Sequence, residues 1–448
     1  MEKLKLEQTA LGIEFGSTRI KAVLIDEQHQ PAASGDYLWE NQFENGIWTY
    51  PQEEMIRGLQ AAYAALATDV RERYGQELTT TGCIGISAMM HGYLAFDREN
   101  RLLVPFRTWR NTITEQAAAE LTEAFDFNIP QRWSIAHLYQ AVLNQEEHLT
   151  RLHWFTTLAG YVHFLLTGEK VLGIGDASGM FPIDSDAGNY DQRMLGLFDG
   201  IMEQRIRAGA QPYPWKLQEL LPKVLLAGEA AGRLTPEGAK LLDPTGLLQP
   251  GILFCPPEGD AGTGMTATNS VAPRTGNVSA GTSIFAMVVL ERPLRQVHQE
   301  IDLVTTPSGD AVAMVHCNNC TSDLNAWVNL LEEAGQLYAG TAGMDKGTLF
   351  TRLFELSLSG DPDCGGVIPV NYFSGESVTH LNAGLPLLLR APGNQFRLAN
   401  LMRANLYSAM ATLAIGLELL REEEVAVDTL YGHGGLFKTP GVAQSYLA

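Results

Sequence analysis

Two glycine turns that carry hydroxyl side chains are the residues whose types first suggest chemistry in this sequence. Gly16–Thr18 lies between two apolar runs near the start of the chain, and Gly281–Ser283 lies between two others much later. Backbone N–H groups and hydroxyls in such turns can bind successive phosphates of a nucleotide. Either turn alone would more often be ordinary hairpin chemistry. Their recurrence, together with nearby acids, favours phosphate binding.

Two acidic residues are placed where an ATP-dependent phosphotransferase needs them. Glu14 belongs to the first apolar run, just before the first turn, and Asp260 lies in the stretch "EGDAGTG". Phosphoryl transfer requires a carboxylate that accepts the proton of the acceptor hydroxyl and a divalent cation that neutralises the triphosphate. Asp260 suits the base and Glu14 suits a magnesium ion, which prefers oxygen ligands. A helix N-cap is the competing interpretation of Asp260.

A third cluster could contact a polar substrate. The stretch "SAMMHGYLAFD" places Met90 and His91 at the end of an expected strand, and "FRTWRNT" supplies Trp109 and Asn111. Open α/β sheets bind ligands at the carboxyl ends of their strands. A lone histidine at a strand end is more often a satisfied structural group, so the pattern alone leaves both interpretations open.

Two further patterns remain ambiguous when taken singly. In "DTLYGHGGLFKTP", Gly434 and Gly435 would let a planar ring approach the backbone closely. A plain strand-to-helix turn explains them equally well. Cys317 and Cys320 form a lone CxxC, and without a second pair at zinc-ribbon spacing two ordinary thiols are the better interpretation.

The elements that must position these residues alternate between strand-like and helix-like patterns, which is typical of an α/β fold. Residues 12–26 predict a hairpin, 51–75 an amphipathic helix, and 79–89 a buried strand. Residues 112–169 are predicted to be mostly helical. The stretch 249–276 is rich in Gly and Pro and predicts an irregular join between two lobes. The echo of the first hairpin after it predicts that the lobes have related folds.

The composition excludes several classes of protein. The chain has 448 residues, 45% of them hydrophobic, and a formal net charge of −20, which argues against a nucleic-acid partner. No apolar run is long enough to span a membrane, and the charged start does not resemble a signal peptide. The five cysteines form no disulfide framework, so we expect a cytoplasmic protein.

Taken together, these stretches resemble the FGGY carbohydrate kinase family. "GIEFGSTRIKAVLID" and "GNVSAGTS" are similar to its two phosphate hairpins, "IGISAMMHGYLAFD" to the xylulokinase-type "GISGQMHG" strand, and "GDAGTG" to its catalytic-aspartate loop. "LTGEKVLGIGDASGMFPID" resembles its Asp-Ala-Ser segment and "GHGGLFKTP" its adenosine loop. The resemblance implies a two-lobed actin-like ATPase (ribonuclease H-like) α/β fold, with an N-terminal lobe at 1–262, a C-terminal lobe at 263–448 and a ligand cleft between the lobes.

The resemblance also assigns roles to particular positions. It implies ATP and Mg²⁺ as cofactors and a ketose or polyol, xylulose- or ribulose-like, as the substrate. Asp260 would be the general base, and Glu14 and Asp260 would face the metal. The remaining assignments are the phosphate contacts Gly16, Ser17, Thr18, Gly281 and Thr282, the adenosine contacts Gly434 and Gly435, and the sugar wall Met90, His91, Trp109 and Asn111.

Departures from the family pattern define the alternatives. The family usually has Asp where this chain has Glu14, and the xylulokinase-type pattern has an acid where this chain has Asn111. The last loop, with Lys438 and Pro440, is closer to ribulokinases, which leaves the sugar open. A sensor that binds sugar or nucleotide without turnover is therefore the alternative to an active kinase. An actin- or chaperone-like ATPase would not need the "MMHG" and "WRNT" elements.

The end of the sequence gives one more expectation. "GVAQSYLA" stops inside an expected helix, and members of the family continue for several tens of residues. We therefore expect an incomplete second lobe. The apolar surface left exposed could be covered by a partner chain, so a homodimer is a possible assembly.

Overall fold

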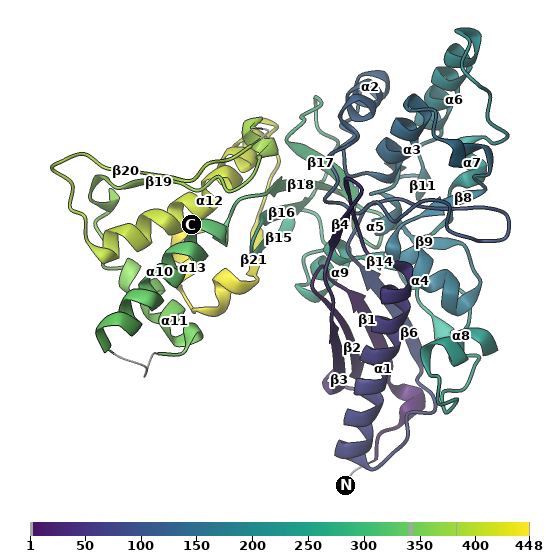
Figure 1. Ribbon diagram of the computed structural model, residues 1–448, viewed down its shortest axis with the longest axis horizontal. Helices are drawn as coiled ribbons and strands as arrows, with labels where there is room; N and C mark the ends of the chain where they lie inside the picture. The colour runs from purple at the N-terminus through teal and green to yellow at the C-terminus, as the bar shows by residue number, and fades with distance from the viewer. Residues whose placement is uncertain (1–2, 340–343, 382, 448) are drawn as a thin grey trace. The chain divides into compact units, whose positions relative to one another are not determined.

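The computed structural model describes residues 3–339, 344–381 and 383–447, which form two compact units (Figure 1). The N-terminal unit comprises residues 1–267 and 303–311, and the C-terminal unit comprises 268–302 and 312–448. The boundary expected after residue 262 falls inside α9 (Asp260–Ala267). None of the helices in the described ranges is both long and apolar enough to cross a lipid bilayer.

The N-terminal unit is built on a mixed sheet with the strand order β13-β6-β1-β2-β3, in which β14 also pairs with β6. The hairpin predicted at residues 12–26 is confirmed, since β1 and β2 pair antiparallel on either side of the first glycine turn. The strands of this sheet are β1 (Ala10–Phe15), β2 (Arg19–Ile25), β3 (Pro31–Leu38), β6 (Cys83–Ala88), β13 (Leu253–Phe254) and β14 (Glu258–Gly259).

The helix predicted at 51–75 is confirmed as α1 (Gln52–Tyr74), which lies along the sheet in Figure 1. Its C-terminal cap is Gly75, whose φ of 65° is the left-handed conformation that glycine adopts most easily. Its buried face, which includes Leu59 and Leu66, belongs to one apolar cluster with β1, β6 and α4 (Leu158–Thr167). The predicted strand at 79–89 is also confirmed, as β6.

The remaining part of the N-terminal unit is mostly helical between residues 112 and 169, as predicted. Its helices are α2 (Glu115–Phe125), α3 (Ser134–Leu143), α5 (Ile174–Ala177), α6 (Gln192–Arg207), α7 (Leu217–Leu220) and α8 (Pro236–Leu242). Its short strands are β4 (Gln42–Glu44), β5 (Ile47–Thr49), β7 (Leu94–Phe96), β8 (Trp154–Thr156), β9 (Val171–Gly173), β10 (Ile183–Asp184), β11 (Asn189–Tyr190) and β12 (Lys223–Leu225).

The prediction that residues 249–276 lack regular structure is wrong. Two short strands and α9 lie in this stretch, and α9 begins at Asp260. The glycine and threonine residues of α9 have low helix propensity, so the sequence pattern did not predict a helix there. The change from one compact unit to the other does fall within the stretch, after Ala267.

The C-terminal unit repeats the strand pairing of the N-terminal unit, as the echo between the hairpins predicted. The order β18-β16-β15-β21 matches β3-β2-β1-β6. In each order, neighbours among the first three strands pair antiparallel, and the last strand pairs in parallel with the first strand of the hairpin. These strands are β15 (Thr275–Ala280), β16 (Ile284–Val289), β18 (Ala311–Cys317) and β21 (Thr429–His433). Strand β17 (Ile301–Thr305) crosses the unit boundary.

The helices of the C-terminal unit are α10 (Thr321–Ala339), α11 (Lys346–Ser357), α12 (Leu398–Glu422) and α13 (Val442–Leu447). Two short strands, β19 (Ile368–Val370) and β20 (Leu387–Leu389), pair antiparallel with each other. Helix α12 approaches the sheet closely. A Cβ on Gly416 would lie 2.1 Å from a methyl carbon of Val315, so only glycine fits there.

Candidate active site

The carboxyl ends of three neighbouring parallel strands bring together most of the predicted residues of the N-terminal unit, all except Trp109 and Asn111. Glu14 of β1 is in register with Ser87 of β6, and Ser87 is in register with Glu258 of β14. The first glycine turn, the Met90–His91 segment and Asp260 each follow one of these strands within a few residues. Residues far apart in the sequence therefore meet where α/β sheets bind ligands.

Asp260 is the first residue of α9, and its Oδ1 accepts a hydrogen bond from the Met90 N–H at 3.2 Å. Its side chain is exposed, but the surrounding protein reduces its hydration and raises the pKa to about 6. The negative charge of Glu14 adds to this rise, whereas the Met90 N–H opposes it. A carboxylate with a pKa close to neutrality is suited to general base catalysis.

Two buried acids next to this edge were not assigned from the sequence. Glu258 accepts hydrogen bonds from the backbone N–H groups of Gly175 and Asp176, the latter at 2.9 Å. A Cβ on Gly173 would lie 2.1 Å from the Glu258 carboxylate, so this glycine makes room for it. Burial is the main cause that raises the pKa of Glu258 to about 8.

Asp176 is fully buried, and its Oδ2 accepts a hydrogen bond from the Thr157 hydroxyl at 2.5 Å. Among the residues that the structure describes, no partner is recorded for its Oδ1. Burial raises the pKa of Asp176 to about 7, and the negative charge of Asp260 contributes. The Asp-Ala-Ser segment pointed to this region, but no local pattern reveals that its carboxyl group is buried.

Met90 lies tightly packed beside Asp260, and His91 follows it in the chain. A Cβ on Gly259 would lie 2.1 Å from the Met90 Cγ, so glycine is required there. His91 has a φ of 68° and is only 5% exposed, and its Nδ1 lies 3.3 Å from the Gly179 carbonyl oxygen. The positive φ of His91 turns the chain just after β6. Contact with substrate stays a prediction for Met90 and His91.

The amide of Asn111 is engaged within the protein. Its Oδ1 accepts the Trp48 N–H at 2.8 Å, and its Nδ2 donates to the carbonyl oxygens of Trp48 at 2.8 Å and Thr108 at 3.0 Å. Asn111 is 2% exposed. It therefore fastens β5 to the segment that carries Trp109, which lies half-buried against the main apolar cluster.

In the C-terminal unit, the second turn and the glycine loop lie side by side. Strand β21 pairs with β15 in parallel, with His433 opposite Ser279. Gly434 directly follows β21, and Gly281 directly follows β15, so the two glycines come at the same end of neighbouring strands. Gly434 has a φ of 98°, and a Cβ there would lie 2.5 Å from the Ala280 carbonyl oxygen. The structure thus brings together the residues predicted to bind phosphate and adenosine within this unit.

The thiols of the lone CxxC are buried. Cys317 ends β18 and Cys320 precedes α10, and burial raises the pKa of each thiol to about 12. Both thiols therefore stay protonated at neutral pH. The Cys320 backbone N–H donates to the Thr282 carbonyl oxygen at 3.1 Å, which gives this residue a structural contact with the second turn.

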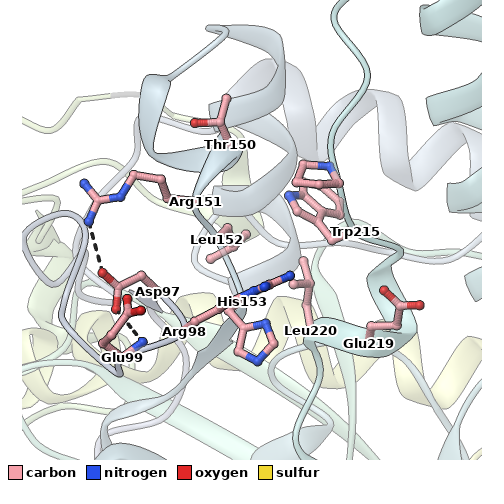
Figure 2. Close-up of a pocket in the computed structure, with 11 residues that line it drawn as sticks. Asp97, Arg98, Glu99, Thr150, Arg151, Leu152, His153, Trp215, Glu219 and Leu220 are labelled. Atoms are coloured by element: carbon pink, nitrogen blue, oxygen red, sulfur yellow. Dashed lines mark hydrogen bonds and ion pairs between the residues drawn. The ribbon is translucent and has the colours of Figure 1, made fainter.

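A separate pocket of the N-terminal unit, shown in Figure 2, contains none of the predicted residues. It is lined by Asp97, Arg98, Glu99, Thr150, Arg151, Leu152, His153, Pro214, Trp215, Glu219 and Leu220. Among its lining residues, Asp97 pairs with Arg151 at 3.0 Å. Asp97 also binds Arg101, which lies outside the lining, at 2.9 Å. Because the predicted residues lie elsewhere, the candidate active site is the sheet edge and not this pocket.

The oxygen donors available fit a magnesium ion shared with phosphate. Within the described ranges, no group of three or more His, Cys, Asp or Glu side chains is arranged to hold a metal ion. Glu14 is close enough to Asp260 for its negative charge to raise the pKa of the Asp260 carboxyl group. Magnesium in kinases is commonly held by one or two carboxylates together with substrate phosphates, so a pair of carboxylates is enough in chemical terms.

Comparison with known proteins identifies the class as carbohydrate kinases. The N-terminal domain model of the FGGY family of carbohydrate kinases matches residues 9–252, and the C-terminal domain model matches residues 276–448. The chain belongs to this family, and it is a sugar kinase with the two-lobed α/β fold that the resemblance implied.

Similar proteins include several xylulose kinases. The chain is 22% identical to a xylulose kinase of Haemophilus influenzae over 443 residues, which cover 95% of this chain and 82% of that protein. A ligand-bound xylulose kinase of Lactobacillus acidophilus has a similar structure, with a TM-score of 0.76 and 14% identity over 98% of this chain and 83% of that one. A gluconate kinase of the same organism gives a TM-score of 0.75 at 15% identity, covering 98% and 83%.

Proposed function

We propose that this kinase transfers the γ-phosphate of ATP to a hydroxyl of a xylulose- or ribulose-like ketose or polyol, with Asp260 as the general base. The observation that carries the proposal is the position of Asp260. Its carboxylate starts α9 at the sheet edge, accepts the Met90 N–H, and has a pKa raised to about 6. The similarity to xylulose kinases supports the sugar class.

In the proposed reaction, Asp260 accepts the proton of the sugar hydroxyl while the hydroxyl oxygen attacks the γ-phosphorus of ATP. The bond from this phosphorus to the bridging oxygen breaks, and ADP leaves with the electron pair. When bound, Mg²⁺ would neutralise charge on the phosphates, and Glu14 and Asp260 would hold it. The residues of the chain position the hydroxyl, accept its proton and bind the phosphates.

The nucleotide contacts follow from the two hairpins. We propose that Gly16, Ser17 and Thr18 bind ATP phosphate in one unit, and that Gly281 and Thr282 do so in the other. Gly434 and Gly435 would then contact the adenosine, since Gly434 lies against Ala280, next to the second turn.

The sugar contacts are proposed for Met90, His91 and Trp109. Asn111, predicted to bind substrate directly, would act through Trp109 and β5, because its amide is engaged by backbone groups. We also propose a cytoplasmic enzyme that acts on small molecules, consistent with five free cysteines. The homodimer stays a prediction.

The test is ADP release from ATP and Mg²⁺ across a panel of ketoses, polyols and sugar acids. We expect one sugar to stimulate ADP release, and Asp260→Asn to reduce this turnover by about a thousandfold or more while ATP still binds. Asp186→Asn, in the exposed turn between β10 and β11, is the matched control and should keep full activity. Near-normal turnover in Asp260→Asn would show that another group is the base.

A sensor without turnover is the second candidate, and the surroundings of Glu14 favour it. Glu14 lies opposite Lys21 in the hairpin, and the Lys21 ammonium is 3.5 Å from its carboxylate, which weakens its attraction for a cation. Binding of ATP and a sugar by the wild-type chain, without ADP release, would support the sensor. Full activity in Glu14→Asp would argue for the kinase, since the family usually has the shorter acid.

A further inference from the structure

The carbonyl groups of the first glycine turn all point into the protein. The indole N–H of Trp39 donates to the Gly16 carbonyl oxygen at 2.7 Å, and the Tyr50 hydroxyl donates to that of Ser17 at 2.7 Å. The backbone N–H of Trp39 donates to the Thr18 carbonyl oxygen at 3.2 Å. Three successive carbonyls are therefore held by two residues that lie just beyond β3 and β5.

The orientation of these carbonyls fixes the orientation of the amides. In a planar trans peptide, the C=O of one residue and the N–H of the next point in opposite directions. The N–H groups of Ser17 and Thr18 therefore point away from Trp39 and Tyr50. In the part of the chain that the structure describes, no hydrogen-bond acceptor is recorded for either N–H, and both residues are exposed.

The two aromatic donors are themselves immobilised. The rings of Trp39 and Tyr50 stack with their centroids 4.1 Å apart, and the edge of Phe15 packs against Trp39. Trp39 is 5% exposed and Tyr50 is 1% exposed. Burial raises the pKa of Tyr50 to about 12, so its hydroxyl remains a donor at neutral pH.

The second glycine turn has the same orientation, although different groups hold it. The Gly281 carbonyl oxygen accepts the Thr321 hydroxyl at 2.8 Å and the Thr321 backbone N–H at 3.2 Å, and that of Thr282 accepts the Cys320 N–H at 3.1 Å. Two successive carbonyls thus point inward in each unit. Because unrelated donors produce the same result, the orientation of the peptide groups is the shared feature.

We propose that Trp39 and Tyr50 are positioning residues that hold the Gly16–Thr18 turn with its amide N–H groups facing outward, ready to bind anionic phosphate oxygens. Successive outward N–H groups form an anion-binding concavity. This inference rests on the proposed binding of ATP phosphate at this turn. The side chains themselves touch only the inner face of the turn and need not contact ATP.

The experiment measures the binding of ATP and of adenosine to the full chain by calorimetry, which requires no knowledge of the sugar. Tyr50→Phe and Trp39→Phe remove the donors but keep aromatic rings. We expect each to weaken ATP binding by about fivefold to tenfold, the effect of one misplaced hydrogen-bonding group. Adenosine binding should not change. With the sugar found in the ADP-release panel, the KM for ATP should also rise with little change in kcat.

Two substitutions in the same unit serve as matched controls. Trp215→Phe removes an indole N–H that donates to the Leu149 carbonyl oxygen at 2.8 Å, and Tyr37→Phe removes a hydroxyl that donates to Glu54 at 3.2 Å. Neither bond involves the turn, so both variants should bind ATP as the wild type does. Thermal unfolding checks that every variant is folded. If Trp39→Phe does not fold, Tyr50→Phe decides, because it removes one oxygen atom.

Unchanged ATP affinity in the folded Phe variants would overturn the inference, and so would an equal loss of ATP and adenosine binding. Sugar-dependent ADP release by the wild type would then show that the kinase function stands without it. A wild-type chain that binds no ATP would overturn both proposals.

Discussion

In the N-terminal unit, the carbonyls of the first glycine turn accept hydrogen bonds from two aromatic side chains. In the C-terminal unit, the carbonyls of the second glycine turn accept them from the start of a helix. Trp39 and Tyr50 hold the first turn, and Cys320 and Thr321 hold the second. The strand pairing around the turns is the same in both units. The two units therefore share the inward direction of the turn carbonyls, but different residues hold these carbonyls in each unit.

The largest effect should come from the glycine that lies against the second turn. In Gly434→Ala, the added Cβ would lie 2.5 Å from the Ala280 carbonyl oxygen, at a φ of 98°. We expect the free energy of unfolding to fall by about 2 to 4 kcal/mol. Chemical denaturation measures this loss. Gly435→Ala is the control, since nothing lies within 4 Å of its Cβ position. Equal stability of the two variants would contradict the close approach of the strands.

The next largest effect should come from Asn111, whose amide holds the strand that leads to Tyr50. In Asn111→Asp, a carboxylate oxygen would face the carbonyl oxygens of Trp48 and Thr108 in place of the amide donor. We expect a loss of about 1 to 3 kcal/mol in the free energy of unfolding, measured with urea. The strand that leads to Tyr50 would also be loosened.

The control for this substitution is Asn189→Asp in β11. The Asn189 Oδ1 accepts the Tyr190 N–H at 2.8 Å, and a carboxylate can keep that bond. Its stability should therefore be close to that of the wild type. Full stability of Asn111→Asp would mean that the amide does not hold β5.

A third prediction concerns the buried acid behind the first sheet edge. The pKa of Asp176 is raised from 3.8 to about 7 by burial, so the folded state binds its proton more tightly than the unfolded state. Its contribution to stability is present below pH 4 and is lost as the pH rises to about 7. We expect Asp176→Asn to flatten this decline, measured as the urea midpoint against pH. Asp186→Asn, at an exposed position, should keep the wild-type slope.

The smallest effect should come from one bond of the second turn. Thr321→Val removes the hydroxyl that donates to Gly281 but leaves the Thr321 backbone N–H in place. We expect ATP binding to weaken by only about twofold to threefold, less than in Tyr50→Phe. Thr351→Val is the control, since its hydroxyl donates to the Gly347 carbonyl oxygen within α11. A loss as large as that of Tyr50→Phe would show that backbone donors do not substitute for side chains here.

The hairpins, the main helix and the two related lobes could be predicted because their signals are local. Glycine turns between apolar runs predict hairpins, and helical periodicity ending at Gly75 predicted α1. Asp260 and the glycines of the last loop were singled out by their residue pattern, and the family resemblance supplied the roles expected of them. The structure places Asp260 directly after β14 and Gly434 directly after β21. The strand before Asp260 was not expected, because the sequence predicted an irregular join there.

The features that the sequence did not predict depend on contacts between segments that are far apart in the chain. Nothing local in the sequence shows that Tyr50 donates to Ser17, 33 positions earlier, or that Glu258 binds the backbone at Asp176. Helix α9 was considered only through the competing N-cap interpretation of Asp260, because its glycine and threonine residues have low helix propensity. Burial decides the state of Asp176, and burial follows only from the assembled fold.

The hydrogen bonds to the turn carbonyls have an electronic consequence as well as a geometric one. A peptide group whose oxygen accepts a hydrogen bond becomes more polarised, and its own N–H becomes a stronger donor. The Gly16 carbonyl accepts an indole N–H at 2.7 Å, and the Ser17 carbonyl accepts a phenol O–H at the same distance. The amides of Ser17 and Thr18 should therefore attract an anion more strongly than the same turn would in isolation.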